Sequence, residues 1–446
     1  MPKAPRLRDP VLWIFALGVA LRVFMSFRIH FGTDDIAIYH QALDLYLDGH
    51  LSPVGARVVY SNTQIPGALQ SLLMGLPLFL SGGMPQGPAV FLALWNSAAL
   101  AVIYVWVREL FPRLERLPLA GWVFLCPWSL AFIELWNPSF LPLFSALFFF
   151  ALWRLEQKPG NHWAALTAAA CVMACLQLHL SFVVLAALLG LWILRHWRNA
   201  SWMGLVGGVA LGGLTLVPYF AHQWASAQGN PFLAGNVVLH LDRVLQWPMI
   251  CLRFLAFSTG ELTRFISLPG KGFGGTLSLV TEHAWLIPLY VLTLLGTVAL
   301  IVLGVCGLGR MIRYWRLVPH TPDEFIATLV LDALLATCVG FLVSIKDPSA
   351  HTFWILFPLS FLPVAAKLAS RPMQKRRRIP AWGIATYLAA SVLFLLLAYP
   401  KVPTNSPLRD AVSLARGHYP QPIDTLPGSA EARAAAEALY RVWSRR

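Results

Sequence analysis

The stretch R-I-H-F-G-T-D-D-I-A-I-Y-H-Q-A-L-D-L-Y-L-D-G, residues Arg28 to Gly49, directly follows the first long apolar segment of the chain. Asp34 and Asp35 stand side by side at the point where this segment would leave the hydrocarbon of a membrane. A charged side chain at the centre of a bilayer costs about 2.5–3.5 kcal/mol on insertion scales, and less near the surface, unless it is hydrated or paired. The two adjacent carboxylates therefore indicate a hydrated, functional cavity at one face of a membrane.

The composition is that of a polytopic membrane protein. Of the 446 residues, 57% are hydrophobic and 12% are charged, whereas a soluble domain carries about 25% charged residues. The 18 Trp suit the aromatic belts at the two membrane surfaces. The net charge of +14 does not indicate nucleic-acid binding, because the basic residues stand in short clusters between apolar segments, as membrane topology requires.

Apolar segments run almost the whole length of the chain. They cover 11–29, 65–83, 88–107, 117–133, 139–153, 162–178, 180–195, 201–220, 285–308, 326–345, 352–366 and 381–399. The segment 65–83 contains Pro66 and Pro77 and ends in a Gly/Pro-rich stretch, so we expect it to lie in the membrane interface or to dip in and return. The other segments predict an all-α polytopic membrane protein with about 11 transmembrane helices and amphipathic helices in its first external loop.

Basic clusters between these segments predict the topology. They are Lys3/Arg6/Arg8, Arg108/Arg113/Arg116, Arg154/Lys158, Arg195/Arg198, Arg310/Arg313/Arg316, and Lys367/Arg371 with Lys375 to Arg378. All of them are cytoplasmic if a single crossing separates Asp34 from Arg108, with the N-terminus inside and the C-terminus outside. The polar turns of the chain then gather on the external side.

Four regions follow from this topology. Residues 1–220 form an N-terminal transmembrane module whose external loop, 30–87, carries the acidic pair. Residues 221–284 form a second external loop, in which 243–257 has apolar residues at helical spacing and is expected to lie in the interface. Residues 285–399 supply the C-terminal transmembrane helices, and 400–446 form an external tail.

The first loop resembles that of the membrane-embedded GT-C glycosyltransferases. The resemblance is to the protein O-mannosyltransferase and lipid A aminoarabinose transferase group and its bacterial relatives. It rests on an Arg late in the first helix, a pair of acids, and a Tyr, an Ala and a Gly at set spacing, which are here Arg22, Asp34, Asp35, Tyr39, Ala42 and Gly49. The sequence departs from that pattern in having Gln64-Ile65-Pro66 in place of His-Pro-Pro and Asp in place of Glu as the second acid.

The resemblance implies transfer of a sugar from a polyprenyl-phosphate carrier to a lipid, glycan or protein acceptor. The reaction would take place at the periplasmic face of a bacterial inner membrane. Asp34 is the candidate general base, since a carboxylate beside a second carboxylate binds a proton more strongly. Asp35 would orient the loop, bind the acceptor or hold a divalent cation, although no metal is expected to be obligatory. A hydrated pair that caps a helix is the alternative for both residues.

A departing lipid phosphate requires cations, because they stabilise the charge that develops on it. The candidates on the external side are Arg57, Arg253, Arg264, Lys271, Lys346 and His351. Each of them, taken singly, is also explained as an anchor whose charged end reaches the membrane surface. Further candidates for the cavity wall are Tyr39, Glu134, Asn137 and His179. A single base and a phosphate leaving group predict one displacement with inversion at the anomeric carbon.

Two other functions compete with this interpretation. A transporter or flippase of lipid-linked glycans would have charges in the middle of its spans and repeated halves, whereas here charges avoid the span centres. An O-antigen-type ligase or polymerase would depend on Arg and His of a late loop rather than on acids after the first helix. Replacement of Asp34 separates the transferase from both.

Overall fold

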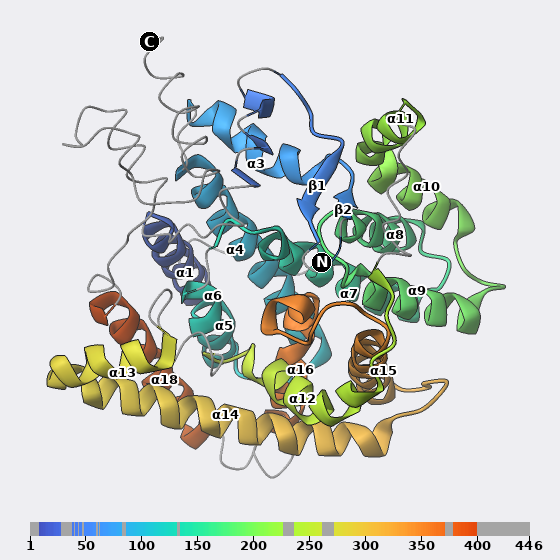
Figure 1. Ribbon diagram of the computed structural model, residues 1–446. Coiled ribbons are helices and arrows are strands. Elements are labelled where there is room, and N and C mark those ends of the chain that lie inside the picture. Colours follow the sequence, from blue (N-terminus) through green and yellow to red (C-terminus); the bar gives the residue numbers. More distant parts are fainter. Residues whose placement is uncertain are drawn as a thin grey trace, which may run out of the picture.

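The computed structural model describes residues 9–27, 38–39, 41–42, 44–46, 49–58, 61, 63–82, 86–131, 134–225, 236–260, 272–370 and 378–398. Within these ranges the chain is a bundle of helices with one small sheet (Figure 1). The predicted site residues Asp34, Asp35, Arg264 and Lys271 lie outside the described residues, as does the predicted tail 400–446.

The helices coincide with the apolar segments, which confirms the predicted all-α polytopic fold. The N-terminal half contains α1 (Pro10–Ser26), β1 (Val54–Arg57), β2 (Gln64–Pro66), α3 (Leu69–Leu80), α4 (Gln86–Leu110), α5 (Arg116–Phe124), α6 (Pro127–Ala131), η1 (Asn137–Phe140), α7 (Leu141–Gln157), α8 (His162–Leu176) and α9 (Phe182–His196). The remainder contains α10 (Trp202–Gly213), η2 (Leu214–Leu216), α11 (Val217–Ala225), η4 (Leu241–Gln246), α12 (Trp247–Ala256), α13 (Gly272–Glu282), η6 (Ala284–Leu286), α14 (Ile287–Tyr314), α15 (Pro322–Leu342), η7 (Ala350–Leu356), α16 (Phe357–Leu368) and α18 (Arg378–Ala398).

Among the described residues, seven helical segments are long and apolar enough to cross a membrane. Four apolar helices are shorter, namely α1, α3, α8 and α9. α3 has 12 residues and is therefore about 18 Å long, against about 30 Å for the hydrocarbon of a bilayer. The segment 117–133 is divided into α5 and α6 at Pro127, which lacks the N–H that a continuous helix requires.

The first predicted external loop contains the helix α3, within the segment 65–83, and also a small hairpin that the sequence did not predict. β1 and β2 pair antiparallel, with Val54 opposite Pro66 and Arg57 opposite Gln64. The β-branched residues Val54, Val58 and Ile65 favour extended backbone. Pro66 stands at the end of β2, a position at which its missing donor is tolerated. The hairpin matters for function because it forms one wall of the pocket described below.

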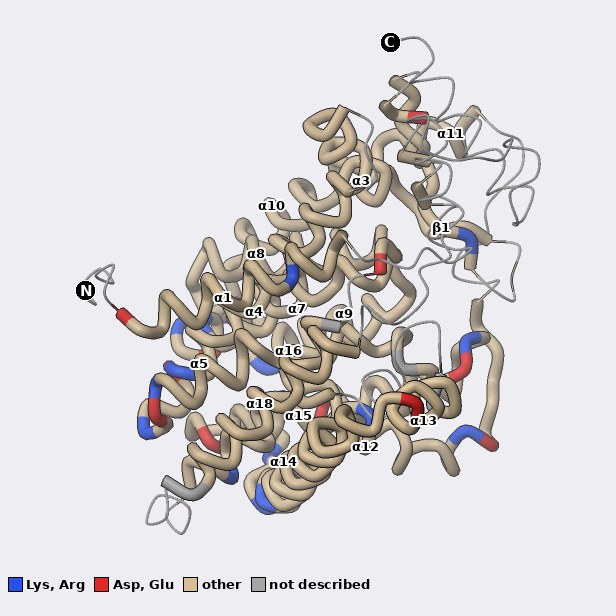
Figure 2. Tube along the Cα trace, turned by 90° about the vertical axis from the view of Figure 1, so that its left-hand side faces the viewer, with Lys and Arg blue, Asp and Glu red and all other residues tan. Residues whose placement is uncertain are grey.

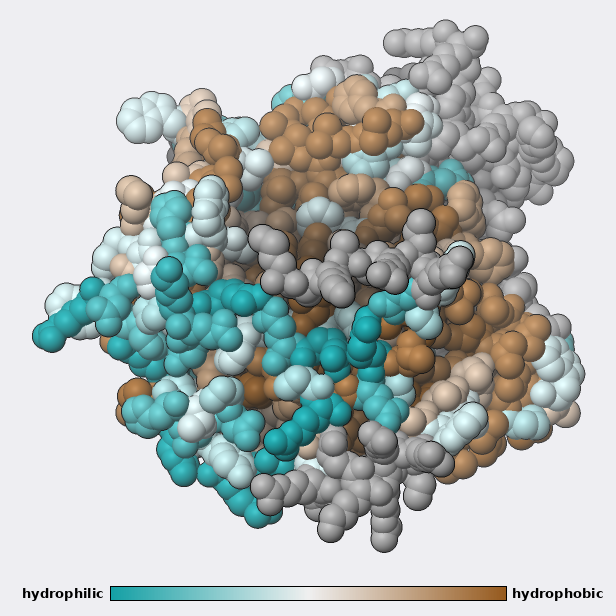
Figure 3. Space-filling model, turned by 180° about the vertical axis from the view of Figure 1, so that it is seen from behind, coloured by the Kyte–Doolittle hydropathy of each residue, from teal (hydrophilic) through white to brown (hydrophobic). Residues whose placement is uncertain are grey.

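Bulky aromatic side chains fill the interior, whereas apolar side chains also cover much of the outer surface. Trp106, Trp122 and Trp354 are fully buried. α10 and α14 instead expose most of their apolar residues. Figure 3 shows wide hydrophobic areas on the face seen from behind, with the hydrophilic residues gathered in one region. This distribution is expected of helices that face lipid on one side and pack on the other.

Charged residues gather at the ends of the helices, with few between them (Figure 2). At one end, Arg116 of α5 pairs with Asp9, the residue before α1, at 2.6 Å, and Arg154 of α7 pairs with Glu109 of α4 at 2.6 Å. We call this the basic end; the C-terminus of α14 and the N-terminus of α15 also lie there, because they share a pocket with the α4–α5 turn. The 21 residues of α15 extend about 30 Å from it, so the turn that follows α15 belongs to the opposite end.

Candidate active site

A pocket of about 200 Å³ lies at the end opposite the basic end, between the hairpin, the start of η1, the α8–α9 turn and the turn before η7. We call it the His351 pocket. It brings together five residues that the sequence analysis singled out as phosphate-binding or cavity-lining candidates, namely Arg57, Asn137, His179, Lys346 and His351. Ile38 and Gln41, which follow the acidic pair by a few residues in the sequence, also line it.

The described residues that line the pocket carry positive charge. Arg57 comes from β1 and Lys346 from the turn after α15, so two cations from distant parts of the chain share one cavity. Among the described residues that line it there is no aspartate or glutamate. Arg presents a planar fork to phosphate oxygens, and Lys presents a compact charge. The His351 pocket is therefore suited to an anion such as a phosphate.

The ring of His351 is held in place from two sides. Its centroid lies 4.4 Å from that of Trp136, which precedes η1, and 6.4 Å from that of His179. The hydroxyl of Ser349 lies 3.2 Å from both ring nitrogens. Two imidazoles, one from the α8–α9 turn and one from η7, therefore stand edge to face within one cavity.

His179 is buried and neutral. Its Nδ1 accepts the backbone N–H of Ser181 at 3.1 Å and lies 2.9 Å from the hydroxyl of the same residue. Burial lowers the pKa of His179 well below its usual value, and the neighbouring charges of His351 and Lys346 lower it further. Because Nδ1 accepts a backbone N–H, the ring proton resides on Nε2, which makes this histidine a hydrogen-bond donor.

Asn137 connects two walls of the pocket. Its side-chain amide donates to the carbonyl of Leu178 at 2.6 Å and so joins the first residue of η1 to the α8–α9 turn. Asn137 is 5% exposed, which leaves its side chain little freedom to turn toward a ligand. We therefore assign it to the wall of the pocket.

Arg243 organises the turn that carries Lys346. The guanidinium donates to the carbonyl oxygens of Phe341 at 3.0 Å and Lys346 at 2.8 Å, and it pairs with Asp347 at 2.8 Å. It donates to the carbonyl of Ser344 as well. The side chain of Arg243 is 5% exposed, although the sequence placed this residue at the end of an interfacial helix. It therefore acts as an internal clamp rather than as a surface anchor.

The segment before Arg243 joins the same turn to the hairpin. The N–H groups of Val238 and His240 donate to Val343 and Leu342, at 3.1 and 2.7 Å, and Ile345 donates to Asn236 at 3.0 Å. The amide of Asn236 donates to the hydroxyl of Thr63, just before β2, at 2.8 Å. Residues 236–243 thus fasten the late turn to the first loop, and both supply walls of the His351 pocket.

Arg22, the arginine of the resemblance, lies inside the bundle. It is 1% exposed and donates to the carbonyls of Gly18 and Phe124, at 2.9 and 2.8 Å, and to the hydroxyl of Ser129 at 2.6 Å. These bonds join α1 to α5 and α6. Arg22 therefore fixes the helix from which the acidic loop departs.

The other candidates lie elsewhere. Tyr39 is fully buried and packs in the core, although its neighbour Ile38 lines the pocket. Glu134 and Arg253 are not among the residues that line it. In the part of the chain that the structure describes, no group of three or more His, Cys, Asp or Glu residues could hold a metal ion.

Sequence reasoning missed several residues of the site. Gln41, Gln64 and Trp136 line the pocket, and Arg243 clamps its late turn. Trp136 stood in a predicted external turn, but nothing in the sequence separates it from the other tryptophans. The contacts of Arg243 cross about a hundred residues of chain, so no local pattern indicates them.

Comparison with known proteins gives structural relatives only. No family model and no curated protein matches the chain. The crystal structure of ArnT from Cupriavidus metallidurans bound to undecaprenyl phosphate superposes with a TM-score of 0.51 at 14% identity, over 98% of this chain and 76% of that one. Its apo state gives a TM-score of 0.51 over 97% and 75%.

An oligosaccharyltransferase of Archaeoglobus fulgidus, solved with zinc and sulfate, gives a TM-score of 0.47 at 14% identity, over 95% of this chain and 58% of that one. The overlap with ArnT extends over nearly the whole chain, transmembrane helices and loops together. The chain thus has the GT-C fold that its first loop predicts.

Proposed function

We propose that the protein is an inverting glycosyltransferase that moves a sugar from a polyprenyl-phosphate carrier to an acceptor at the His351 pocket. The observation that carries the proposal is the convergence of Arg57, Lys346 and His351 on one cavity whose wall includes Ile38, four residues after Asp34. The fold of ArnT, which was solved bound to undecaprenyl phosphate, supports the choice of carrier.

In the proposed reaction, Asp34 removes the proton from the acceptor hydroxyl or amine. The freed electron pair attacks the anomeric carbon of the donor sugar, and the bond from that carbon to the phosphate oxygen breaks on the opposite side. The proton remains on Asp34 and the bonding electrons leave with the lipid phosphate. One displacement of this kind inverts the anomeric configuration.

The cations of the pocket would stabilise the leaving group. The phosphate of the donor is a diester that becomes a monoester and gains negative charge as the bond to the sugar breaks, and preformed positive groups at that position lower the barrier. Arg57 and Lys346 supply permanent charge, and the neutral His179 supplies a donor. Asp35 would orient the acceptor or the loop, and we expect activity to persist in the presence of a chelator.

The test compares Asp34→Asn with Asp44→Asn, which removes another carboxylate of the same loop. Surface glycans and glycolipids of the source organism are profiled by mass spectrometry in the wild type, a deletion strain, and the deletion strain carrying each variant. We expect the deletion and Asp34→Asn to lose the same sugar and to accumulate its polyprenyl-phosphate form. Asp44→Asn should restore the wild-type profile.

A wild-type profile with Asp34→Asn, at normal protein level, would contradict the proposal and favour a transporter or a ligase. The sugar that disappears would identify the donor. The glycan or glycolipid that persists without this sugar would identify the acceptor in the same experiment. Lys346→Gln, which removes the charge of the side chain and shortens it by one atom, should lower the rate of transfer by about 10- to 1000-fold, as loss of a group that stabilises charge does.

A further inference from the structure

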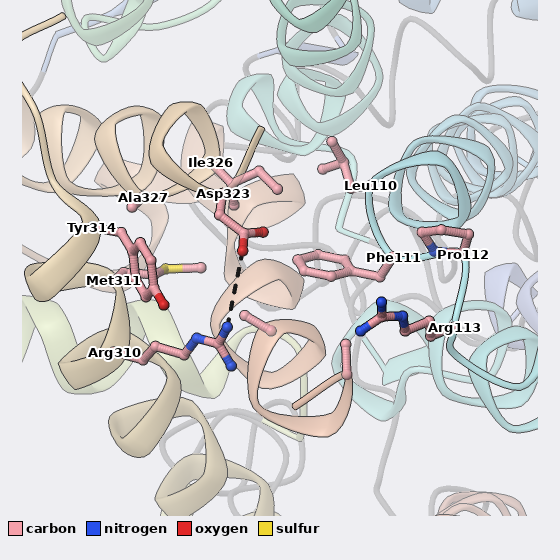
Figure 4. A pocket seen from close by; sticks show the side chains of 12 residues that line it. Leu110, Phe111, Pro112, Arg113, Arg310, Met311, Tyr314, Asp323, Ile326 and Ala327 are labelled. Atoms are coloured by element: carbon pink, nitrogen blue, oxygen red, sulfur yellow. Dashed lines mark ion pairs between the residues drawn. The ribbon is translucent and has the colours of Figure 1, made fainter. Parts of the chain in front are cut away.

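A second pocket, of about 300 Å³, opens at the basic end and is not part of the site described above. We call it the Arg310 pocket. It lies between the α4–α5 turn, the C-terminal part of α14, the first turns of α15 and the end of α16 (Figure 4). The length of α15, about 30 Å, separates it from the end that holds the His351 pocket.

Small side chains at the end of α16 leave the space that forms this cavity. Ala366 and Ala369 stand three positions apart near the end of α16, so both small side chains face the same space. The remaining floor is apolar and buried, with Phe111 at 7%, Met311 at 3% and Ile326 at 3% exposure. A hollow with an apolar floor is therefore built into the packing of these helices.

The rim of the pocket is positively charged. Figure 4 shows Arg113 and Arg310 on opposite sides of the cavity, and Asp323 beside Arg310. Asp323 is the one carboxylate among the described lining residues, so two guanidinium groups meet a single negative charge. The described lining residues therefore carry more positive than negative charge.

The ion pair within the pocket is loose. Arg310 lies 3.9 Å from Asp323, whereas Arg116 and Asp9 are 2.6 Å apart and Arg195 and Asp332 are 2.8 Å apart. The side chains of Arg310 and Asp323 are 38% and 63% exposed, and a pair so accessible to solvent contributes at most about 1 kcal/mol. A ligand can therefore displace Asp323 from the guanidinium of Arg310 at little cost in free energy.

We propose that the Arg310 pocket binds a phosphate group between Arg113 and Arg310. The pocket lies where α14 and α15 leave the apolar layer, and basic pockets between transmembrane helices at this level accept anionic lipid headgroups. The phosphate of a lipid headgroup and a free phosphate share the required chemistry. The apolar floor beside Phe111 and Met311 leaves room for the first carbons of a lipid.

The experiment measures the thermal stability of the purified full-length protein in detergent. Phosphatidylglycerol, phosphatidylcholine and inorganic phosphate are added in separate titrations, and any ligand of the folded state raises Tm. We expect phosphatidylglycerol to raise Tm in a saturable way and phosphatidylcholine to have no such effect. A shift from inorganic phosphate equal to that from phosphatidylglycerol would identify a free phosphate as the ligand.

Variants assign the effect to the pocket. Arg113→Gln combined with Arg310→Gln should remove most of the shift, whereas Arg313→Gln should keep it. Arg313 lies on the same helix and carries the same charge, but it does not line the cavity. Ala366→Leu keeps every charge and fills the hollow, so it should weaken binding at least about tenfold if the ligand enters the cavity.

An equal shift in the double variant and the wild type would overturn the proposal. A loss as large in Arg313→Gln would also overturn it, because it would show attraction to the basic surface in general. If the double variant does not fold, Ala366→Leu decides the question by itself. Glycan transfer is not part of this measurement, so the result stands apart from the proposed function.

Discussion

Two buried arginines hold the parts of the molecule that carry the candidate site. Arg22 and Arg243 each donate to several main-chain carbonyls, from helices or turns far apart in the sequence. A buried charge is costly unless hydrogen bonds satisfy it. The guanidinium group suits this task because its five donors point in fixed directions. Loss of either side chain would leave carbonyl oxygens buried without a donor.

Replacement of Arg243 by Gln should destabilise the turn 341–347 and the His351 pocket together. The substitution leaves the carbonyl oxygens of Phe341 and Lys346 without this donor, and each polar group left buried and unsatisfied costs about 1–3 kcal/mol. We therefore expect a clear fall in Tm in detergent and a larger loss of transfer activity than of expression. Arg253→Gln is the matched control, because Arg253 lies on α12 and does not line the pocket. Equal effects of the two substitutions would contradict the clamp.

His179 should make the stability of the protein depend on pH. Its pKa in the folded chain is well below the ordinary value of 6.5, so below that pH the unfolded chain binds a proton that the folded chain excludes. The free energy of unfolding therefore falls as the pH drops below about 6.5, by at most about 1.4 kcal/mol per pH unit. Above that pH the histidine is neutral in both states and contributes no pH dependence.

His179→Asn keeps an acceptor near the position of Nδ1 and does not titrate. The pH dependence of Tm between pH 7 and pH 5 should be shallower in this variant than in the wild type. His222→Asn, which removes an exposed histidine of α11, is the matched control. If Tm changed with pH equally in His179→Asn and in the wild type, this histidine would already be charged in the folded protein.

At the scale of the element, α10 depends on three glycines. Gly204, Gly208 and Gly212 recur every four residues, so they share one face of the helix. A Cβ at each of them would meet a main-chain carbonyl of α8, from His162, Leu166 and Ala170 respectively. Small residues at this spacing let two membrane helices approach closely without a hydrophobic driving force between them. α8 in turn leads directly to the turn that holds His179.

Gly208→Leu should separate α10 from α8, because the new side chain would occupy the place of the Leu166 carbonyl. We expect a loss of about 1–3 kcal/mol of stability, the usual cost of overpacking, measured as Tm or as resistance to protease. Gly207→Leu is the control on the adjacent residue: a Cβ there would meet Leu166 only at 3.8 Å. If both variants behave alike, the close packing of the two helices is not what stabilises α10.

At the scale of the whole molecule, the two pockets should face opposite sides of the membrane. The positive-inside rule places the basic end in the cytoplasm, and α15 separates that end from the turn 343–351. Single cysteines at Ser349 and Arg313, in a chain whose 6 native Cys are replaced, can be tested with a membrane-impermeant thiol reagent. Ser349→Cys should react in intact spheroplasts, and Arg313→Cys only after lysis. The reverse pattern would invert the proposed topology.

Much of the fold and part of the site could be predicted from the sequence. The apolar segments locate the helices, because a helix in lipid must satisfy its backbone groups by itself and needs a continuous apolar run. Lys346, His351, Arg57 and His179 were singled out as polar residues of predicted external turns, and the structure gathers them in one pocket. The β1–β2 hairpin was not predicted, since its short strands have no clear alternating pattern.

The sequence by itself determined the helical, polytopic architecture, because lipid imposes the same local requirement on each segment. It also determined on which end of the bundle most charges would lie. Only the tertiary structure decided that Arg243 is an internal clamp, that Tyr39 packs in the core while Ile38 lines a pocket, and that Arg113 and Arg310 face each other across a hollow. These arrangements depend on contacts between distant segments, whose free energies come from shape and buried hydrogen bonds rather than from any local pattern.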